Sequence, residues 1–480
     1  MVSRYSWSII NTTVSIFSAV MIFNGVDEVG LFLFVNPLLG EFPQGWRQVA
    51  RVIVGYLVFL AWFTVAHIMI AYVSNALKRQ GFEGELEEGE TQGRSWVVND
   101  TVRGDNGQPV EPTLVRPGGR EKSVAIVGNV EVFVMTKDLA KQGFEQRTKC
   151  WSMLYAHMAG FAMISAGGDL QHAEPFRGSS VMSFVSVAVN VLFLLSLFRL
   201  SRAMRPTVED SDDEEEAEAV RLCEEHAIEA EDELFCLSIS FLFVQAVRYS
   251  VTGVLSTKNG SEPGEEFGLR EIATVYGVGV LAVAGAFLMA LSGYSRRLAD
   301  LARGTFCMAF AWCLLFASRW MFESWRLLVT LDVSPRTIEG RVVLALFLST
   351  FTAFAIIVLD KFEDTSRNPR LAHNVVKNLV TGLSILVGFT WEHVVDGCTE
   401  AIASIYHGHE LKKLVSKVVG ATIIPLVVLP AWRRHVLQKV LMLMKHKKDK
   451  RVAERLAQMV SGGKIELSSS EDEPDADLAW

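Results

Sequence analysis

Apolar residues in this chain fall into ten blocks of about 20 residues, and this pattern constrains the fold more than any other feature. A helix rises about 1.5 Å per residue, so each block can cross the roughly 30 Å hydrocarbon core of a bilayer. Soluble proteins instead alternate apolar and polar faces with periods of 3.6 or two residues. The blocks cover residues 9–28, 50–76, 151–169, 181–200, 235–255, 273–294, 304–325, 341–360, 377–397 and 414–432.

The composition agrees with this pattern. Half of the 480 residues are hydrophobic, and the mean hydropathy is +0.27. Ten spans need roughly 200 apolar positions, which this chain can supply. Charged residues make up 21% of the chain, so substantial aqueous segments remain. The sequence therefore predicts an all-α polytopic membrane protein of the plasma membrane or an endomembrane, with the lipid bilayer as its main partner. It gives no indication of nucleic-acid binding and no prediction of oligomeric state.

The ten blocks form five pairs joined by short connections, and longer or basic connections separate the pairs. Basic residues favour the cytoplasmic side of a membrane. The clearest basic groups follow the fourth, sixth and tenth blocks, at Arg199, Arg202 and Arg205, at Arg296 and Arg297, and at Arg433 and Arg434. We therefore predict five helical-hairpin repeats with both termini cytoplasmic, and an uncleaved first helix.

This topology divides the chain into eight segments. Hairpins are expected at residues 1–76, 150–205, 235–299, 300–362 and 363–432. A cytoplasmic segment at 77–149, an acidic linker at 206–234 and a cytoplasmic tail at 433–480 complete the chain.

The three aqueous segments differ in character. Residues 77–149 contain two β-like runs, Ser95–Val98 and Ser123–Val127 with Val130–Met135, which predict a small β element. Residues 209–233 hold 14 acids and one arginine, typical of a solvated linker; a cation-binding or regulatory role is the alternative. The tail begins basic and ends acidic. Cytoplasmic protein partners would bind the 77–149 segment and the tails.

Motifs for modification or chemistry are few. Asn259 begins a glycosylation sequon in a predicted external loop, and acidophilic kinase sites are predicted at Ser211, Ser468, Ser469 and Ser470. The six cysteines form no CxxC pair. His407 and His409 have metal-ligand spacing but lack further ligands, so no metal site is predicted. We find no catalytic motif, and neither an enzyme nor a cofactor is predicted.

The odd-numbered blocks resemble one another. Cys236 precedes Arg248 by the same 12 residues that separate Cys307 from Arg319. Aligned in this frame, Asn24 and Glu392 occupy the arginine position, and Glu28, Thr252, Glu323 and Asp396 stand four residues later. Residues four apart share a helix face. The even-numbered blocks are almost entirely apolar, so we predict an inner ring of odd helices and an outer ring of even helices.

Polar residues inside the blocks are the candidate functional set. A central charge costs about 2.5–3.5 kcal/mol on insertion scales, so such residues face other helices or water. The set is Asn24, Asp27, Glu28, His157, Asp169, Gln245, Arg248, Arg319, Glu323, Glu392, His393 and Asp396.

Two interpretations of this set remain. In the first, the residues line the pathway of a channel or transporter for protons, cations or small solutes, and the excess of acid favours protons and cations. In the second, they are structural salt bridges in a membrane scaffold or receptor that transports nothing. Arg319 would then pair with Glu323, and Arg248 with Glu392 or Asp396.

The blocks SIFSAVMIFNG, AHMAGFAMISAGGDLQ and FLFVQAVRYSVTG alternate with helices that end in arginine pairs and with acidic linkers. Together they resemble multi-pass membrane protein families of dinoflagellate algae. The resemblance covers most of the membrane part and rests on general style rather than on a diagnostic motif. It implies a multi-pass fold and no particular activity, because none is established for those families.

Overall fold

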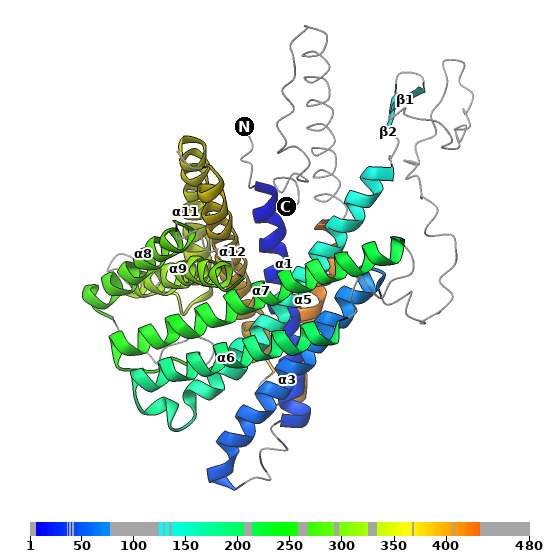
Figure 1. The fold of residues 1–480 in the computed structure, drawn as a ribbon. Coiled ribbons are helices and arrows are strands. Elements are labelled where there is room, and N and C mark those ends of the chain that lie inside the picture. Colours follow the sequence, from blue (N-terminus) through cyan, green and yellow to red (C-terminus); the bar gives the residue numbers. More distant parts are fainter. Residues whose placement is uncertain are drawn as a thin grey trace.

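A computed structural model describes residues 6–35, 37, 40, 43–76, 124–127, 130–133, 137–205, 214–257, 267–291, 297–324, 334–366, 369–406 and 409–432. Ten α-helices lie in these ranges, one for each apolar block (Figure 1). They are α1 (Ser6–Gly30), α3 (Gln44–Val73), α5 (Lys137–His172), α6 (Ser180–Met204), α7 (Glu214–Thr252), α8 (Leu269–Leu291), α9 (Arg297–Ser324), α11 (Ile338–Thr365), α12 (Pro369–Ser404) and α13 (Glu410–Trp432).

Shorter elements join these helices. A π-helical turn, η1 (Leu31–Val35), follows α1, and a 3-10 turn, η2 (Phe176–Gly178), precedes α6. Strands β1 (Val124–Val127) and β2 (Val130–Phe133) pair antiparallel inside the segment where a β element was predicted. Side chains cap two of the helices. Ser179 accepts a bond from the Met182 amide at the start of α6, and Thr337 accepts one from the Gly340 amide at the start of α11.

Eight of these helices are long and apolar enough to cross a membrane, so the chain is a helical multi-pass membrane protein. They are α1, α3, α6, α7, α8, α9, α11 and α13. The other two, α5 and α12, are each 36 residues long but more polar. Both pack among other helices, where protein rather than lipid surrounds them, and a helix in that position needs a less apolar surface.

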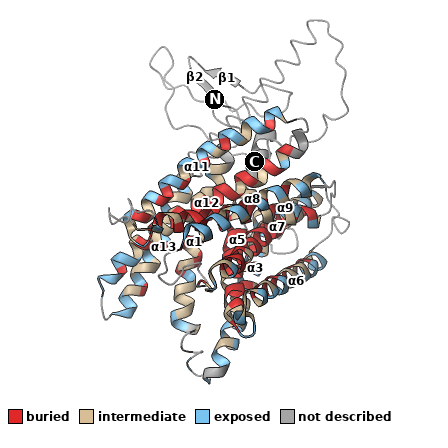
Figure 2. Cartoon of the chain, turned by 90° about the vertical axis from the view of Figure 1, so that its left-hand side faces the viewer, coloured by how far each residue is buried: buried red, intermediate tan, exposed pale blue. Residues whose placement is uncertain are grey.

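The odd-numbered spans form a closed inner ring. α1 packs against α5, α5 against α7, α7 against α9, α9 against α12, and α12 against α1. In α1, α7 and α9, between 50% and 78% of the most apolar stretch is buried, against 11% to 33% in the even-numbered spans. Figure 2 shows the contrast between the buried α5 and α7 and the exposed face of α6. The predicted division into inner and outer helices is confirmed.

Each outer helix packs mainly against the inner helix that follows it in sequence. α3 contacts α5, α6 contacts α7, α8 contacts α9, and α11 contacts α12. The last helix, α13, packs against the first, α1, and so closes the outer ring. The short connections predicted within hairpins therefore join helices that are not each other's main packing partners. This arrangement places the two ends of the membrane part side by side.

The acidic stretch is helical, and the prediction of a solvated linker is wrong for residues 214–234. Helix α7 runs without interruption from Glu214 to Thr252, a length of 39 residues. At 1.5 Å per residue this is about 58 Å, nearly twice the hydrocarbon thickness. The helix therefore continues well beyond the bilayer on the predicted cytoplasmic side, where its acids meet basic residues from neighbouring helices.

Candidate functional site

The half of the ring that is predicted to face outward, called the external half below, holds the polar residues that the odd-helix frame places at one depth. Asn24 of α1 donates a hydrogen bond from Nδ2 to Glu392 Oε1 of α12 at 2.9 Å. These residues occupy equivalent frame positions, and α1 and α12 are neighbours in the ring. Glu392 is buried, so this bond satisfies part of a carboxylate that water does not reach.

A second contact joins α1 to the outer helix α13. Lys417 Nζ lies 2.8 Å from Glu28 Oε1, within the external half of both helices. Asp396 of α12 is half-buried. Sequence reasoning missed Lys417 because the outer helices were taken as apolar, although this lysine lies inside the tenth block. Its isolated charge in an apolar run was the signal that it needed an acidic partner.

Helix α9 carries an ion pair of its own. Arg319 Nε lies 3.9 Å from Glu323 Oε1, one turn further along the helix, so the predicted pairing within this helix is confirmed. Arg336, in the turn before α11, approaches the same carboxylate at 3.7 Å. Glu323 thus sits between two guanidinium groups at the external end of the bundle.

Two polar residues of α7, Arg248 and Gln245, make contacts that hold neighbouring parts of the fold together. The Arg248 guanidinium lies 3.6 Å from the centroid of the Phe316 ring and 5.7 Å from that of Trp320, a cation–π arrangement across the α7–α9 interface. Gln245 donates to the carbonyl oxygens of Ser256 and Thr257 at 3.2 and 3.3 Å, which fixes the turn after α7.

Three members of the predicted set remain, and one of them, His157, lies away from this external group. His157 is fully buried toward the predicted cytoplasmic side, with Nδ1 3.3 Å from Ser15 Oγ and Nε2 3.5 Å from Glu233 Oε1. Asp169, near the external end of α5, is half-buried where Gly55 of α3 passes close. Asp27 is half-buried near the end of α1.

A small cavity lies between α9, α11 and α12 in the external half. Its volume is about 30 Å³, room for about one or two water-sized groups. Its charged and titratable lining residues are Arg319, Arg341 and His393. Arg341, at the start of α11, donates to the His393 carbonyl oxygen at 3.0 Å, and the His393 ring stacks on Phe389. Sequence reasoning missed Arg341 for the same reason that it missed Lys417.

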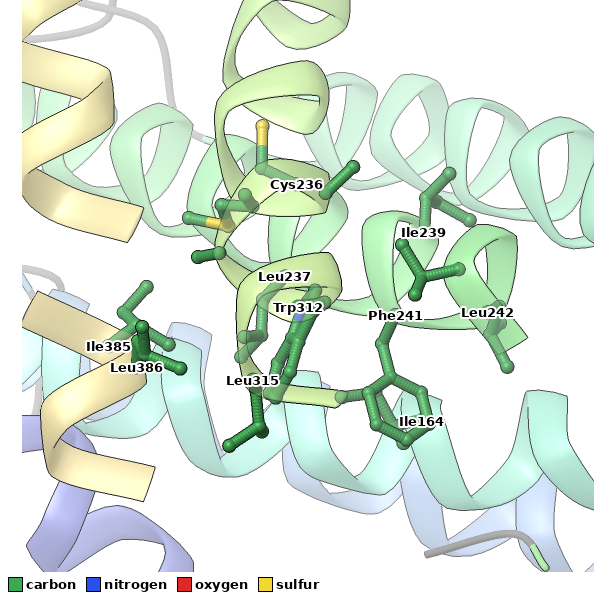
Figure 3. Packing of buried hydrophobic residues seen from close by; sticks show 14 of the residues in the cluster. Ile164, Cys236, Leu237, Ile239, Phe241, Leu242, Trp312, Leu315, Ile385 and Leu386 are labelled. Atoms are coloured by element: carbon green, nitrogen blue, oxygen red, sulfur yellow. The ribbon is translucent and has the colours of Figure 1, made fainter. Parts of the chain in front are cut away.

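Aromatic side chains fill the middle of the ring. Phe389 of α12 stacks on Phe161 of α5 with centroids 6.0 Å apart, and meets Trp312 of α9 edge-on at 5.2 Å. Phe241 of α7 meets Trp312 at 5.1 Å and Phe316 at 6.0 Å. We call these five residues the aromatic plug. Figure 3 shows Trp312 and Phe241 close together, with Ile385 and Leu386 of α12 on the other side.

The fifth inner helix reaches the plug region through close backbone contact. At Gly388 of α12, a Cβ atom would lie 2.0 Å from Ile16 Cγ2 of α1. Only glycine permits this approach, which brings α1 against the helix that carries Phe389. The aromatic plug therefore packs in the interior of the ring, between α5, α7, α9 and α12.

A buried carboxylate organises the predicted cytoplasmic side. Glu231 of α7 is fully buried, and its carboxylate contacts Arg205 at the end of α6, Arg297 at 2.8 Å and His67 of α3 at 3.3 Å. Arg297 also contacts Asp232 at 2.7 Å. We call this group the Glu231 network. It joins α3, α6, α7 and α9, and explains why the acidic half of α7 is helical rather than solvated.

Several predicted sites lie outside the described residues: Asn259, Ser211, Ser468, Ser469 and Ser470. Within the ranges given above, no three His, Cys, Asp or Glu residues are grouped so as to hold a metal ion. The six cysteines are all free thiols. A scan against protein-family models and searches of curated proteins and solved structures found no match to this chain. A function for this protein is therefore inferred from the geometry of the site.

Proposed function

We propose that the protein is a channel or transporter that passes small ions or solutes along the axis of its inner ring, and that this conformation is closed. The observation that carries the proposal is the position of the polar residues. Asn24, Arg319, Glu392 and His393 come from three inner helices, lie away from lipid and gather in the external half beside a cavity. Charges inside a membrane are costly, and they commonly mark ion or substrate pathways.

The preference for cations over anions is weaker than the sequence predicts. The expectation of protons or cations rested on an excess of acids among the odd-numbered helices. Arg341 and Lys417, which come from outer helices, add two positive charges to the same region. With these bases included, the external half suits small ions of either sign, and the lining of its cavity is basic.

Substitution of Glu392 tests the proposal. Glutamine keeps the size and can still accept a bond from Asn24, so the fold should persist while the pathway loses a titratable carboxyl group. We expect ion flux into vesicles containing Glu392→Gln to fall about tenfold, since a barrier change of about 1.4 kcal/mol suffices. Glu363→Gln is the matched control: Glu363 is also buried, but it pairs with His373 at the other end of the bundle, at 3.0 Å. Equal flux in wild type and a folded Glu392→Gln variant would contradict the pathway.

A second candidate is a membrane scaffold or receptor whose charges are purely structural. The Glu231 network favours it, because four helices meet at paired charges that no pathway requires. In that case Glu392→Gln would lower thermal stability, and flux would match that of protein-free vesicles for every variant. Residues 77–149 and the tails would then supply the interaction surfaces.

A further inference from the structure

The cavity between α9, α11 and α12 has the lining of an anion site. Its positively charged groups are Arg319 and Arg341, and none of the described residues that line it carries a carboxylate. The remaining walls are Leu315, Phe316, Pro335, Leu344, Phe389, Thr390 and His393. The Thr390 hydroxyl is already engaged, since it donates to the Val387 carbonyl oxygen at 2.9 Å. The cavity thus offers hydrogen-bond donors and positive charge, but no anionic group to hold a cation.

Arg341 has hydrogen-bonding capacity left over. One terminal nitrogen donates to the His393 carbonyl oxygen, and Nε is buried without a hydrogen-bond partner among the described residues. Among the described residues, no carboxylate oxygen lies within 4 Å of the Arg341 guanidinium group. The Arg341 side chain is half-buried, and the carboxyl groups of Glu392 and Asp396 act on it through space without a direct ion pair. An anion in the cavity would accept hydrogen bonds from the guanidinium donors that the described residues leave unbonded.

The backbone of α12 is shaped to hold Arg341 in place. At Gly397 a Cβ atom would lie 2.5 Å from the Arg341 terminal nitrogen that bonds His393. The guanidinium therefore rests directly on α12, one turn beyond His393, and any larger residue at 397 would displace it. Arg319 reaches the cavity from α9, and its side chain is 16% exposed. Two guanidinium groups are thus fixed on separate helices around one small space.

We propose that this cavity binds one small monovalent anion of the size of chloride. The volume of about 30 Å³ matches an ion little larger than water and excludes organic carboxylates. Guanidinium donors and a largely apolar wall would hold the ion in a low-dielectric setting, where charge attraction is strong. The cavity lies within about one turn of the external end of α11, so aqueous ions reach this depth easily. The site does not require that the anion crosses the membrane.

Thermal unfolding of the purified full chain in detergent tests the site. Sodium chloride is compared with sodium gluconate at equal ionic strength, because gluconate is too large for the cavity. We expect the wild-type midpoint to rise with chloride and to saturate at about 2 °C or more above the gluconate value. Bromide and nitrate should act like chloride. In Arg341→Gln the saturable rise should disappear.

Arg336→Gln is the matched control. Arg336 is 53% exposed and approaches Glu323 a short distance from the cavity, but it does not line it. This variant should keep the chloride response. If Arg341→Gln does not fold, Arg341→Lys keeps the charge and loses the fork, and should need about tenfold more chloride for half-saturation.

Three results would overturn the site: equal wild-type midpoints in chloride and gluconate, loss of the response in Arg336→Gln as well as at Arg341, or an unchanged response in folded variants at Arg341. The outcome is separable from that of the proposed function. A saturable chloride response without ion flux would keep the site and reject transport. Ion flux without any chloride response would support transport and reject the anion site.

Discussion

Glu231→Gln should lower the free energy of unfolding by about 3–5 kcal/mol, because removal of one member of a buried ion pair leaves its partners uncompensated. The carboxylate is fully buried and contacts Arg205, Arg297 and His67. Glutamine preserves the shape but removes the charge that these bases surround. Thermal or denaturant unfolding of the full chain in detergent measures the loss.

The control for this substitution lies two residues earlier on the same helix. Glu229 lies 3.2 Å from Lys149 Nζ and 3.1 Å from His226 Nδ1, but its side chain is 42% exposed. Exposed pairs contribute about 1 kcal/mol or less, so Glu229→Gln should change stability little. Losses of equal size at the two positions would show that the Glu231 network does not organise the predicted cytoplasmic side.

Phe389→Ala should open the aromatic plug and raise ion flux at least about tenfold, which needs a barrier about 1.4 kcal/mol lower. Phe389 contacts Phe161 and Trp312, so it links three inner helices across the axis. Loss of its ring leaves a gap in the aromatic plug, on the axis of the proposed pathway. The same change should cost about 3 kcal/mol of stability, as is usual for a large side chain removed from a packed interior. Flux into vesicles and unfolding in detergent measure the two effects.

Phe354→Ala provides the comparison. Phe354 lies on the outer helix α11 and is 66% exposed, in the position of a lipid-facing residue. Its removal deletes the same ring without touching the axis. We expect unchanged flux and little change in stability. If both alanine variants leak equally, the increase reflects a general loss of packing and not an opened gate.

The helices and their two-ring arrangement could be predicted from the sequence because one physical requirement governs both. Lipid offers no hydrogen-bond partners, so each block must satisfy its backbone N–H and C=O groups within itself. An α-helix meets this requirement. Polar residues on one kind of helix and their near absence on the other then separate inner from outer positions. The bond between Asn24 and Glu392 joins two residues that the frame places at one depth. The five helical-hairpin repeats stay a prediction.

The partners of these residues could not be predicted, because they depend on which helices become neighbours. Sequence order suggests that the members of a hairpin pack together, whereas each outer helix packs mainly on the next inner one. Lys417 meets Glu28 only because the last helix closes against the first. Composition likewise suggested a solvated linker before the fifth apolar block, where the structure has the first half of α7. The acidic residue Glu231 is buried against basic residues from three other helices. These partners are known only once the helices are packed together.

The central claim is that ions pass along the axis of the inner ring. The most direct test is one flux measurement on vesicles that contain wild type, Phe389→Ala or Glu392→Gln protein, with protein-free vesicles alongside. We predict flux above the protein-free level for wild type, about tenfold more for Phe389→Ala and about tenfold less than wild type for Glu392→Gln. If all three proteins are folded and none exceeds the protein-free level for cations, anions or protons, the claim is contradicted.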